Sequence, residues 1–167
     1  LVLMEGQPPH IEWAKLYQER GQLAFRSGDN LDALQWTQRA LQHIEGLTAR
    51  GDEERRDAAA AVALSLNTIG AALARMGRLD EAVTQRERSV AVAREAGLPQ
   101  VECRALSNLG VLYSSLEPQR AIDACERGLQ TAQRIGDLGL QSRLYANLAV
   151  AYCTHTNRCD DRGVGAA

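Results

Sequence analysis

The stretch from residue 66 to residue 90, LNTIGAALARMGRLDEAVTQRERSV, places small residues at fixed intervals. In it, Gly70, Ala82 and Ser89 are separated by 12 and then by 7 positions. A small side chain lets two helix backbones approach closely, because a larger side chain would hold the helix axes apart. The stretch therefore predicts two packed helices that meet at one crossing formed by these three residues.

The same pattern of small residues recurs along the chain. The equivalent sets are Gly21, Ala33 and Ala40 (spacings 12 and 7), Gly110, Ala121 and Gly128 (spacings 11 and 7), and a fourth that opens at Ala149. A repeat of about 40 residues is typical of a stacked helical array, in which each hairpin needs its neighbours to bury its apolar face. Such an array is a binding scaffold, so the pattern argues against an enzyme.

The composition argues against several kinds of partner. The 167 residues carry 19 Lys and Arg against 21 Asp and Glu, a formal charge of −2. With this balance the chain lacks the overall excess of positive charge that would indicate binding to nucleic acid or to an anionic membrane surface. The sequence also lacks an uninterrupted apolar run of the length that a membrane helix needs. We therefore expect neither nucleic acid nor a membrane as a partner.

The cysteines are expected to be reduced thiols in a cytoplasmic protein, because a helical core of this size does not need disulfides. Cys153, His155 and Cys159 form a metal-like cluster, but its fourth ligand would have to be Asp160 or Asp161, and the spacing fits no zinc finger. Cys153 also continues the apolar stripe of a helix. We therefore expect packing there, with no metal and no cofactor.

Helical periodicity predicts seven helices and no strand, with the seventh helix unpaired. Asp29 suits an N-cap, and Glu117-Pro118 is expected to end a helix at Leu116. The expected organisation is a tail or linker at residues 1–9, a repeat domain at 10–155 with units at 11–46, 52–97, 99–136 and a half unit at 138–155, and a disordered tail at 156–167. The start at Leu1 and the incomplete last unit suggest a piece of a longer protein.

The residues around these small positions resemble tetratricopeptide repeats. That family places an aromatic residue or Leu, then Leu-Gly, then Tyr along the first helix of each unit. The corresponding residues are Leu66, Ile69-Gly70 and Leu73, then Leu106, Leu109-Gly110 and Tyr113, then Tyr145, Leu148-Ala149 and Tyr152. The inter-helix turn of the family appears as Gly28-Asp29 and Gly77-Arg78.

The spacing of the units is similar to that of the long-period tetratricopeptide subfamily. Gly70 and Gly110 are 40 residues apart, whereas Gly21 and Gly70 are 49 apart, which implies extra helical turns or a loop near residues 46–57. The resemblance implies an all-α, right-handed superhelical solenoid of antiparallel helix hairpins with about three and a half repeats. A HEAT or armadillo array, also near 40 residues per unit, is the alternative.

The resemblance implies a concave groove lined by the first helix of each unit, and a polar stripe runs along these helices. The candidate peptide-binding residues are Asn67, Arg75, Arg104, Asn108, Val111, Arg143 and Asn147. In the resembled subfamily an Asn at the position of Asn108 and Asn147 contacts bound peptide. The full stripes carry Lys15, Arg26, Arg75, Arg104 and Arg143 against Glu19 alone.

The predicted function is therefore a non-catalytic protein-interaction scaffold whose groove binds a peptide or partner domain, with an acidic segment or a C-terminal carboxylate as the hypothesis. The alternative explanation of the charges is that these arginines are solvated or pair with neighbouring Glu residues. No nucleophile, phosphate-loop or metalloprotease motif indicates catalysis.

Two other functions stay open at this point. The unpaired last helix is expected to expose Leu144, Leu148 and Tyr145, and such a patch would favour a homodimer. The first unit also resembles arrays attached to bacterial cyclases and signalling ATPases, which allows a ligand- or peptide-sensing regulatory module of a larger bacterial signalling protein.

Overall fold

The computed structural model describes residues 10–156, and within this range the chain forms seven α-helices and no strand. The helices are α1 (Ile11–Arg26), α2 (Asn30–Glu45), α3 (Asp52–Arg75), α4 (Leu79–Glu95), α5 (Pro99–Tyr113), α6 (Pro118–Arg134) and α7 (Leu138–Thr156). The expected tail at residues 1–9 lies outside the described residues. Of the tail expected at residues 156–167, only Thr156 is described, and it is the last residue of α7.

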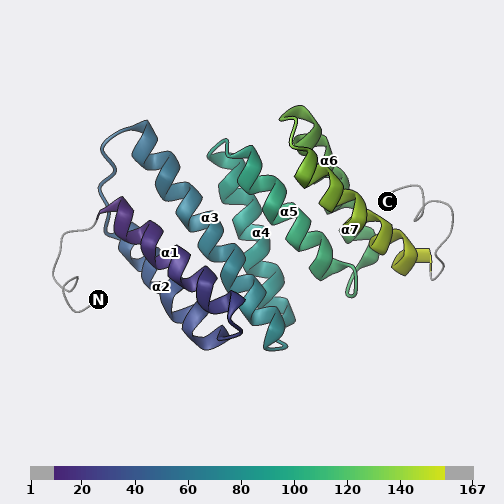
Figure 1. The fold of residues 1–167 in the computed structure, drawn as a ribbon, viewed down its shortest axis with the longest axis horizontal. Helices are drawn as coiled ribbons and strands as arrows, with labels where there is room; N and C mark the ends of the chain where they lie inside the picture. The colour runs from purple at the N-terminus through teal and green to yellow at the C-terminus, as the bar shows by residue number, and fades with distance from the viewer. Residues whose placement is uncertain (1–9, 157–167) are drawn as a thin grey trace.

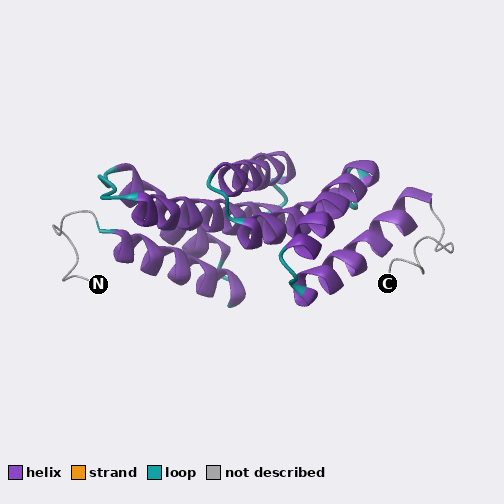
Figure 2. Ribbon diagram, turned by 90° about the horizontal axis from the view of Figure 1, so that it is seen from above, coloured by secondary structure: helices purple, strands orange, loops and turns teal. Residues whose placement is uncertain are grey.

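The helices form a row of antiparallel hairpins (Figure 1). Along the row α1 packs on α2, α3 on α4, and α5 on α6, while α7 packs on α6. The first helices of successive pairs also touch one another, α1 with α3, α3 with α5, and α5 with α7. The row is bowed, with α1 and α7 toward its opposite ends (Figure 2). The predicted all-α solenoid of helix hairpins is thus confirmed.

Tight turns separate most of the helices. A glycine with positive φ follows α1, α3, α4 and α6, at Gly28, Gly77, Gly97 and Gly136. The turn between α5 and α6 has no such glycine. There the amides of Leu116 and Glu117 both donate to the Tyr113 carbonyl O, at 3.0 and 2.8 Å. This closes the turn early, so α5 ends at Tyr113 and the expectation of a helix to Leu116 is wrong.

The long spacing between the first two units has two causes. The chain from Gly46 to Gly51 is a loop, and α3 begins at Asp52 and has 24 residues, more than any other helix of the described range.

The predicted N-cap is also present, because the Asp29 side chain accepts from the Asp32 amide at 2.9 Å.

The small residues pack two helices together, but not at one crossing. A Cβ added to Gly70 would lie 3.0 Å from the Ala82 carbonyl O, so these two residues do meet. Ser89 instead donates from Oγ to the carbonyl O of Ala63, at 2.7 Å. The reason is the antiparallel pairing. Seven residues advance a helix by about 10 Å, so the residue seven after Ala82 faces the residue seven before Gly70. The predicted single crossing is wrong, although both contacts join the same pair of helices.

The last helix is part of the core. Leu144 is 0% exposed and Leu148 is 7% exposed, because α7 lies against both α6 and α5. The Leu144 side chain approaches within 2.8 Å of the place where a Cβ on Gly128 would be. Tyr145 is half-buried. The expected exposed patch of these residues is therefore wrong, and the homodimer hypothesis loses the surface on which it was built.

One helix of the described range, α3, is long and apolar enough to cross a bilayer by length and composition, with a mean hydropathy of 1.4 over its most apolar window. Half of that window is buried inside the solenoid.

Candidate functional site

The inner face of the solenoid holds a pocket of about 280 Å³ to which five helices contribute. Its lining comes from α1, α3, α4, α5 and α7, so all four first helices take part. The lining residues are Gln22, Phe25, Arg26, Asn67, Thr68, Ala71, Arg86, Arg104, Asn108 and Arg143. We call this the inner pocket. Residues as far apart in the sequence as Gln22 and Arg143 meet here only because the repeats stack.

The inner pocket gathers four of the seven candidate residues, namely Asn67, Arg104, Asn108 and Arg143. The other three, Arg75, Val111 and Asn147, are not among its lining residues. Val111 is 54% exposed. Whether any of the seven contacts a ligand stays a prediction.

Arg75 joins the first repeat to the second. Its Nη1 donates to the main-chain O of Phe25 at 2.7 Å, and its Cζ lies 3.7 Å from the centre of the Phe25 ring. The guanidinium therefore satisfies a carbonyl near the end of α1 and stacks on an aromatic ring that lines the inner pocket. This contact places Phe25 and explains Arg75 without a ligand.

The two asparagines at equivalent positions bond to the preceding repeat. The Nδ2 atom of Asn108 donates to Oδ1 of Asn67 at 3.1 Å, and the Nδ2 atom of Asn147 donates to the carbonyl O and Oγ of Ser107 at 3.0 and 2.9 Å. Each Asn thus links its own first helix to the previous one. The Oδ1 atoms of Asn108 and Asn147 accept no hydrogen bond from the described residues, so these oxygens stay open to a ligand.

The charge of the inner pocket is positive. Arg26, Arg86, Arg104 and Arg143 line it, no carboxylate does, and none of the four forms an ion pair within residues 10–156. Lys15, by contrast, pairs with Asp57 at 2.5 Å and does not belong to this group. Pairing with neighbouring acidic residues therefore does not explain these four arginines.

Arg86 is the residue of the inner pocket that sequence reasoning missed. It lies on α4, a second helix, and is 9% exposed. Its Nη1 donates to the main-chain O of Asn108, whereas its Nε is buried without a partner. Burial lowers the pKa of the guanidinium to about 10, which still leaves it a cation at neutral pH.

A sequence signal for Arg86 exists in the repeat pattern. The residue four positions after the second small residue is Thr37 in the first repeat and Cys125 in the third, both buried. Arg86 is the one charged residue at this position. Gly70 makes room for it, because a Cβ there would lie 2.6 Å from Arg86 Cγ.

A second, wider pocket of about 610 Å³ shares Arg104 and Arg143 with the inner pocket and continues between α5 and α7. It contains one carboxylate, Asp137, whose Oδ1 accepts from the Leu140 amide at 2.9 Å as an N-terminal cap of α7. The two exposed arginines therefore lie between two hollows of the same face.

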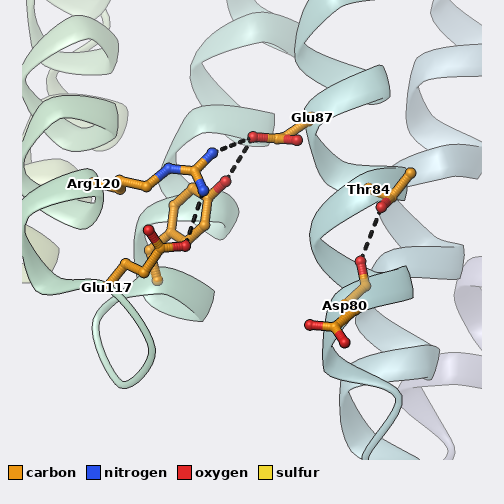
Figure 3. A network of polar contacts seen from close by, with 6 residues as sticks. Asp80, Thr84, Glu87, Glu117 and Arg120 are labelled. Atoms are coloured by element: carbon orange, nitrogen blue, oxygen red, sulfur yellow. Dashed lines mark hydrogen bonds and ion pairs between the residues drawn. The ribbon is translucent and has the colours of Figure 1, made fainter.

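A polar network away from the inner pocket, built from α4, α5 and α6, fixes the second repeat against the third (Figure 3). Glu87 on α4 accepts from the Tyr113 hydroxyl and from Nη2 of Arg120, both at 2.6 Å. Arg120 also donates to Glu117 at 2.9 Å and lies over the Tyr113 ring, 4.3 Å from its centre. Burial and the Glu87 hydrogen bond raise the pKa of Tyr113. None of these residues lines the inner pocket, so the network acts on the packing of the repeats.

The metal-like cluster is only partly within the described range. Cys153 is half-buried on α7, His155 is exposed, and Cys159 lies outside the described residues. Among residues 10–156 no group of three His, Cys, Asp or Glu side chains is arranged to hold a metal ion.

Comparison with known proteins agrees with the repeat pattern. Residues 60–133 match the family model described as tetratricopeptide repeat. These residues span most of the second and third helix pairs. The comparison with curated proteins gave no match.

Three solved structures share the fold. The apo form of RapI is 16% identical with a TM-score of 0.75, over 93% of this chain and 54% of that chain. Aspartyl phosphate phosphatase F from Bacillus subtilis is 13% identical with a TM-score of 0.74, over 93% of this chain and 40% of that one. BtubC (BKLC) from P. vanneervenii is 22% identical with a TM-score of 0.60, over 82% and 53%. The chain thus spans about half the length of these proteins or less, and at such identities the likeness concerns the fold.

Proposed function

We propose that this chain, which carries tetratricopeptide repeats over residues 60–133, is a non-catalytic protein-interaction scaffold. Its inner face would bind an acidic peptide segment of a partner protein. The observation that carries this proposal is the set of four arginines around one pocket without a carboxylate. Arginine presents a rigid fork of donors that suits acidic groups.

The remaining lining suits a peptide. The open Oδ1 of Asn108 can accept from a main-chain amide, and Phe25 offers an aromatic surface beside the charges. Arg104 and Arg143 are exposed and border both pockets, so they can contact a chain that extends past the inner pocket. Because much of this attraction is between solvent-exposed charges, salt should weaken it.

The test is fluorescence anisotropy with the 167-residue chain and labelled hexaglutamate amide, with hexaglutamine amide as the uncharged probe. The double variant Arg104→Gln and Arg143→Gln should weaken hexaglutamate binding by about tenfold or more. The matched control is Arg88→Gln and Arg127→Gln, which removes two exposed charges from the second helices and should leave the affinity within about twofold.

Salt provides an independent measurement. Hexaglutamate binding should fall clearly between about 0.05 and about 0.5 M NaCl. Equal binding of hexaglutamate and hexaglutamine, or equal loss in the two double variants, would contradict the proposal, because the inner-face arginines would then have no special part.

A further inference from the structure

Arg86 is a buried cation without an anionic partner among the described residues. Its side chain is 9% exposed, it makes one hydrogen bond, to a neutral carbonyl group, and its Nε has none. Charged side chains are almost never buried unless they are paired, since removing a charge from water is costly. The pairing group is therefore to be sought in the space that the guanidinium lines, which is the inner pocket.

The path of the side chain shows how it reaches this space. Arg86 begins on α4, its Cγ passes over Gly70 on α3, and its Nη1 reaches the Asn108 carbonyl group on α5. The guanidinium therefore lies between the first helices α3 and α5, where it lines the inner pocket. Thr37 and Cys125, at the equivalent position in the other two pairs, are too short to do this.

The donors at the pocket favour one kind of acidic group. A planar carboxylate is best bound by one arginine that offers two adjacent nitrogens. Arg86 cannot offer its Nε in this way, because that atom is sealed from solvent, and its Nη1 already bonds to Asn108. Arg26, Arg104 and Arg143 add donors from α1, α5 and α7, hence from separate directions.

A phosphoryl group meets these conditions better than a carboxylate does. It has three strong acceptor oxygens that point in different directions, and it carries a charge of about −1.5 to −2 at neutral pH. The positive charge of four guanidinium groups, with no carboxylate among the lining residues, is larger than the negative charge of a single carboxylate. A phosphorylated side chain also differs from free phosphate in having a peptide on which the open Asn108 Oδ1 and Phe25 can act.

We infer that Arg86, with Arg104 and Arg143, forms a subsite for the phosphoryl group of a phosphorylated side chain in the bound peptide. This inference rests on the proposed function, because it names the group that the acidic peptide places on the floor of the inner pocket.

The experiment uses three labelled nine-residue peptides with amidated C-termini, identical Gly-Ser backgrounds, and phosphoserine, Glu or Ser at the centre. Anisotropy titration of the full chain should show the phosphoserine peptide binding at least about tenfold more tightly than the Glu peptide. Arg86→Gln should remove this preference. Arg88→Gln, on the exposed side of the same helix, should keep it. Circular dichroism checks that each variant is folded, and Arg104→Gln, at an exposed position, should lower the preference even if Arg86→Gln disturbs folding.

Three results would overturn the inference. They are equal affinity for the phosphoserine and Glu peptides, a preference that persists in both Arg86→Gln and Arg104→Gln, and inorganic phosphate binding as tightly as the phosphoserine peptide, which would make free phosphate the ligand. Hexaglutamate binding that depends on Arg104 and Arg143 would in each case leave the proposed function standing. Failure of hexaglutamate and of all three peptides to bind would remove both.

Discussion

The Nη1 atom of Arg86 on α4 donates to the main-chain oxygen of Asn108 on α5, and the Asn108 side chain in turn donates to Asn67 on α3. One buried guanidinium is therefore connected to both first helices that flank it. The hydrogen bond to a carbonyl group holds the cation in place but does not neutralise it. The stability of the second repeat and the charge of the inner pocket consequently depend on the same side chain.

The first prediction is that Arg86→Met raises the stability of the ligand-free protein. Met keeps most of the apolar stem that packs over Gly70 and removes the unpaired buried charge, so the free energy of unfolding should increase by about 1–2 kcal/mol. Urea unfolding followed by circular dichroism measures this. Arg88→Met is the control, with an expected change within about 0.5 kcal/mol. A clear loss of stability in Arg86→Met would mean that the guanidinium stabilises the fold without a ligand.

The second prediction concerns the close approach of α5 and α6. A Cβ on Gly110 would lie 2.5 Å from Sγ of Cys125, so Gly110→Ala should cost about 1–3 kcal/mol through overpacking. The double variant Gly110→Ala with Cys125→Ala should recover most of this loss, because the second substitution removes the clashing sulfur and alanine is a better helix former than glycine. A double-mutant cycle from urea unfolding measures the coupling. Additive losses would contradict the contact.

The third prediction is a loss of stability at alkaline pH. Burial raises the pKa of Cys103 and of Cys125 to about 11, whereas an unfolded thiol ionises near about 8.5. Between these values the unfolded chain holds fewer protons than the folded chain, so the free energy of unfolding falls as the pH rises. The stabilisation is fully present below about pH 8.5 and is lost toward about pH 11.

The measurement is urea unfolding at several pH values from about 7.5 to about 10.5, a range that brackets the unfolded pKa. The wild type should lose about 2–3 kcal/mol per buried thiol across this range. At about pH 7.5 Cys125→Ala should have a lower free energy of unfolding than the wild type, because the substitution leaves a small cavity. Its free energy of unfolding should then fall less with rising pH, because one of the two buried thiols is absent. Identical pH dependence in both proteins would show that the Cys125 thiol does not titrate as described.

The fourth prediction assigns Asn147 to the packing of repeats. Its amide donates twice to Ser107, so Asn147→Ala should lower the free energy of unfolding by about 1 kcal/mol and increase hydrogen exchange in α7. Ser142→Ala, at an exposed position of the same helix, is the control and should change neither quantity. An unchanged exchange pattern in Asn147→Ala would show that the link is not stabilising. Because Asn147 and Asn108 bond within the protein, arginine variants give the clearer test of ligand binding.

Much of the fold could be predicted from local signals. The glycine turns and the Asp29 cap each depend on neighbouring residues only, and the structure has them at the expected places. The helix α3 also begins at Asp52, where the second unit was expected to begin. The end of α5 was predicted wrongly because the turn there uses Tyr113 as a shared acceptor and needs no glycine. The burial of Leu144 was also missed, since it depends on a neighbouring helix that contributes Gly128 opposite it.

The candidate site was predicted in part for the same reason. Arg104, Asn108 and Arg143 lie on first helices, and helical spacing alone places Arg104 and Asn108 on one face of α5. Arg86 lies on a second helix, whereas the groove was expected to be lined by the first helix of each unit. Its length and the absence of a side chain at Gly70 let it cross between two helices. Neither the crossing nor the engagement of Arg75 with Phe25 follows from the spacing of residues in one helix.

The sequence by itself determined that this chain is a row of helical hairpins, because helix periodicity, caps and turn glycines act over a few residues and do not depend on distant parts of the chain. Only the tertiary structure decided which arginines share a pocket, which asparagines are already bonded, and which leucines are buried. Those properties depend on atoms in different helices, such as Asn147 and Ser107, which are 40 residues apart, and Arg86 and Asn108, which are 22 residues apart. Stacking alone brings such atoms into contact and separates the charges that are paired from those that are not.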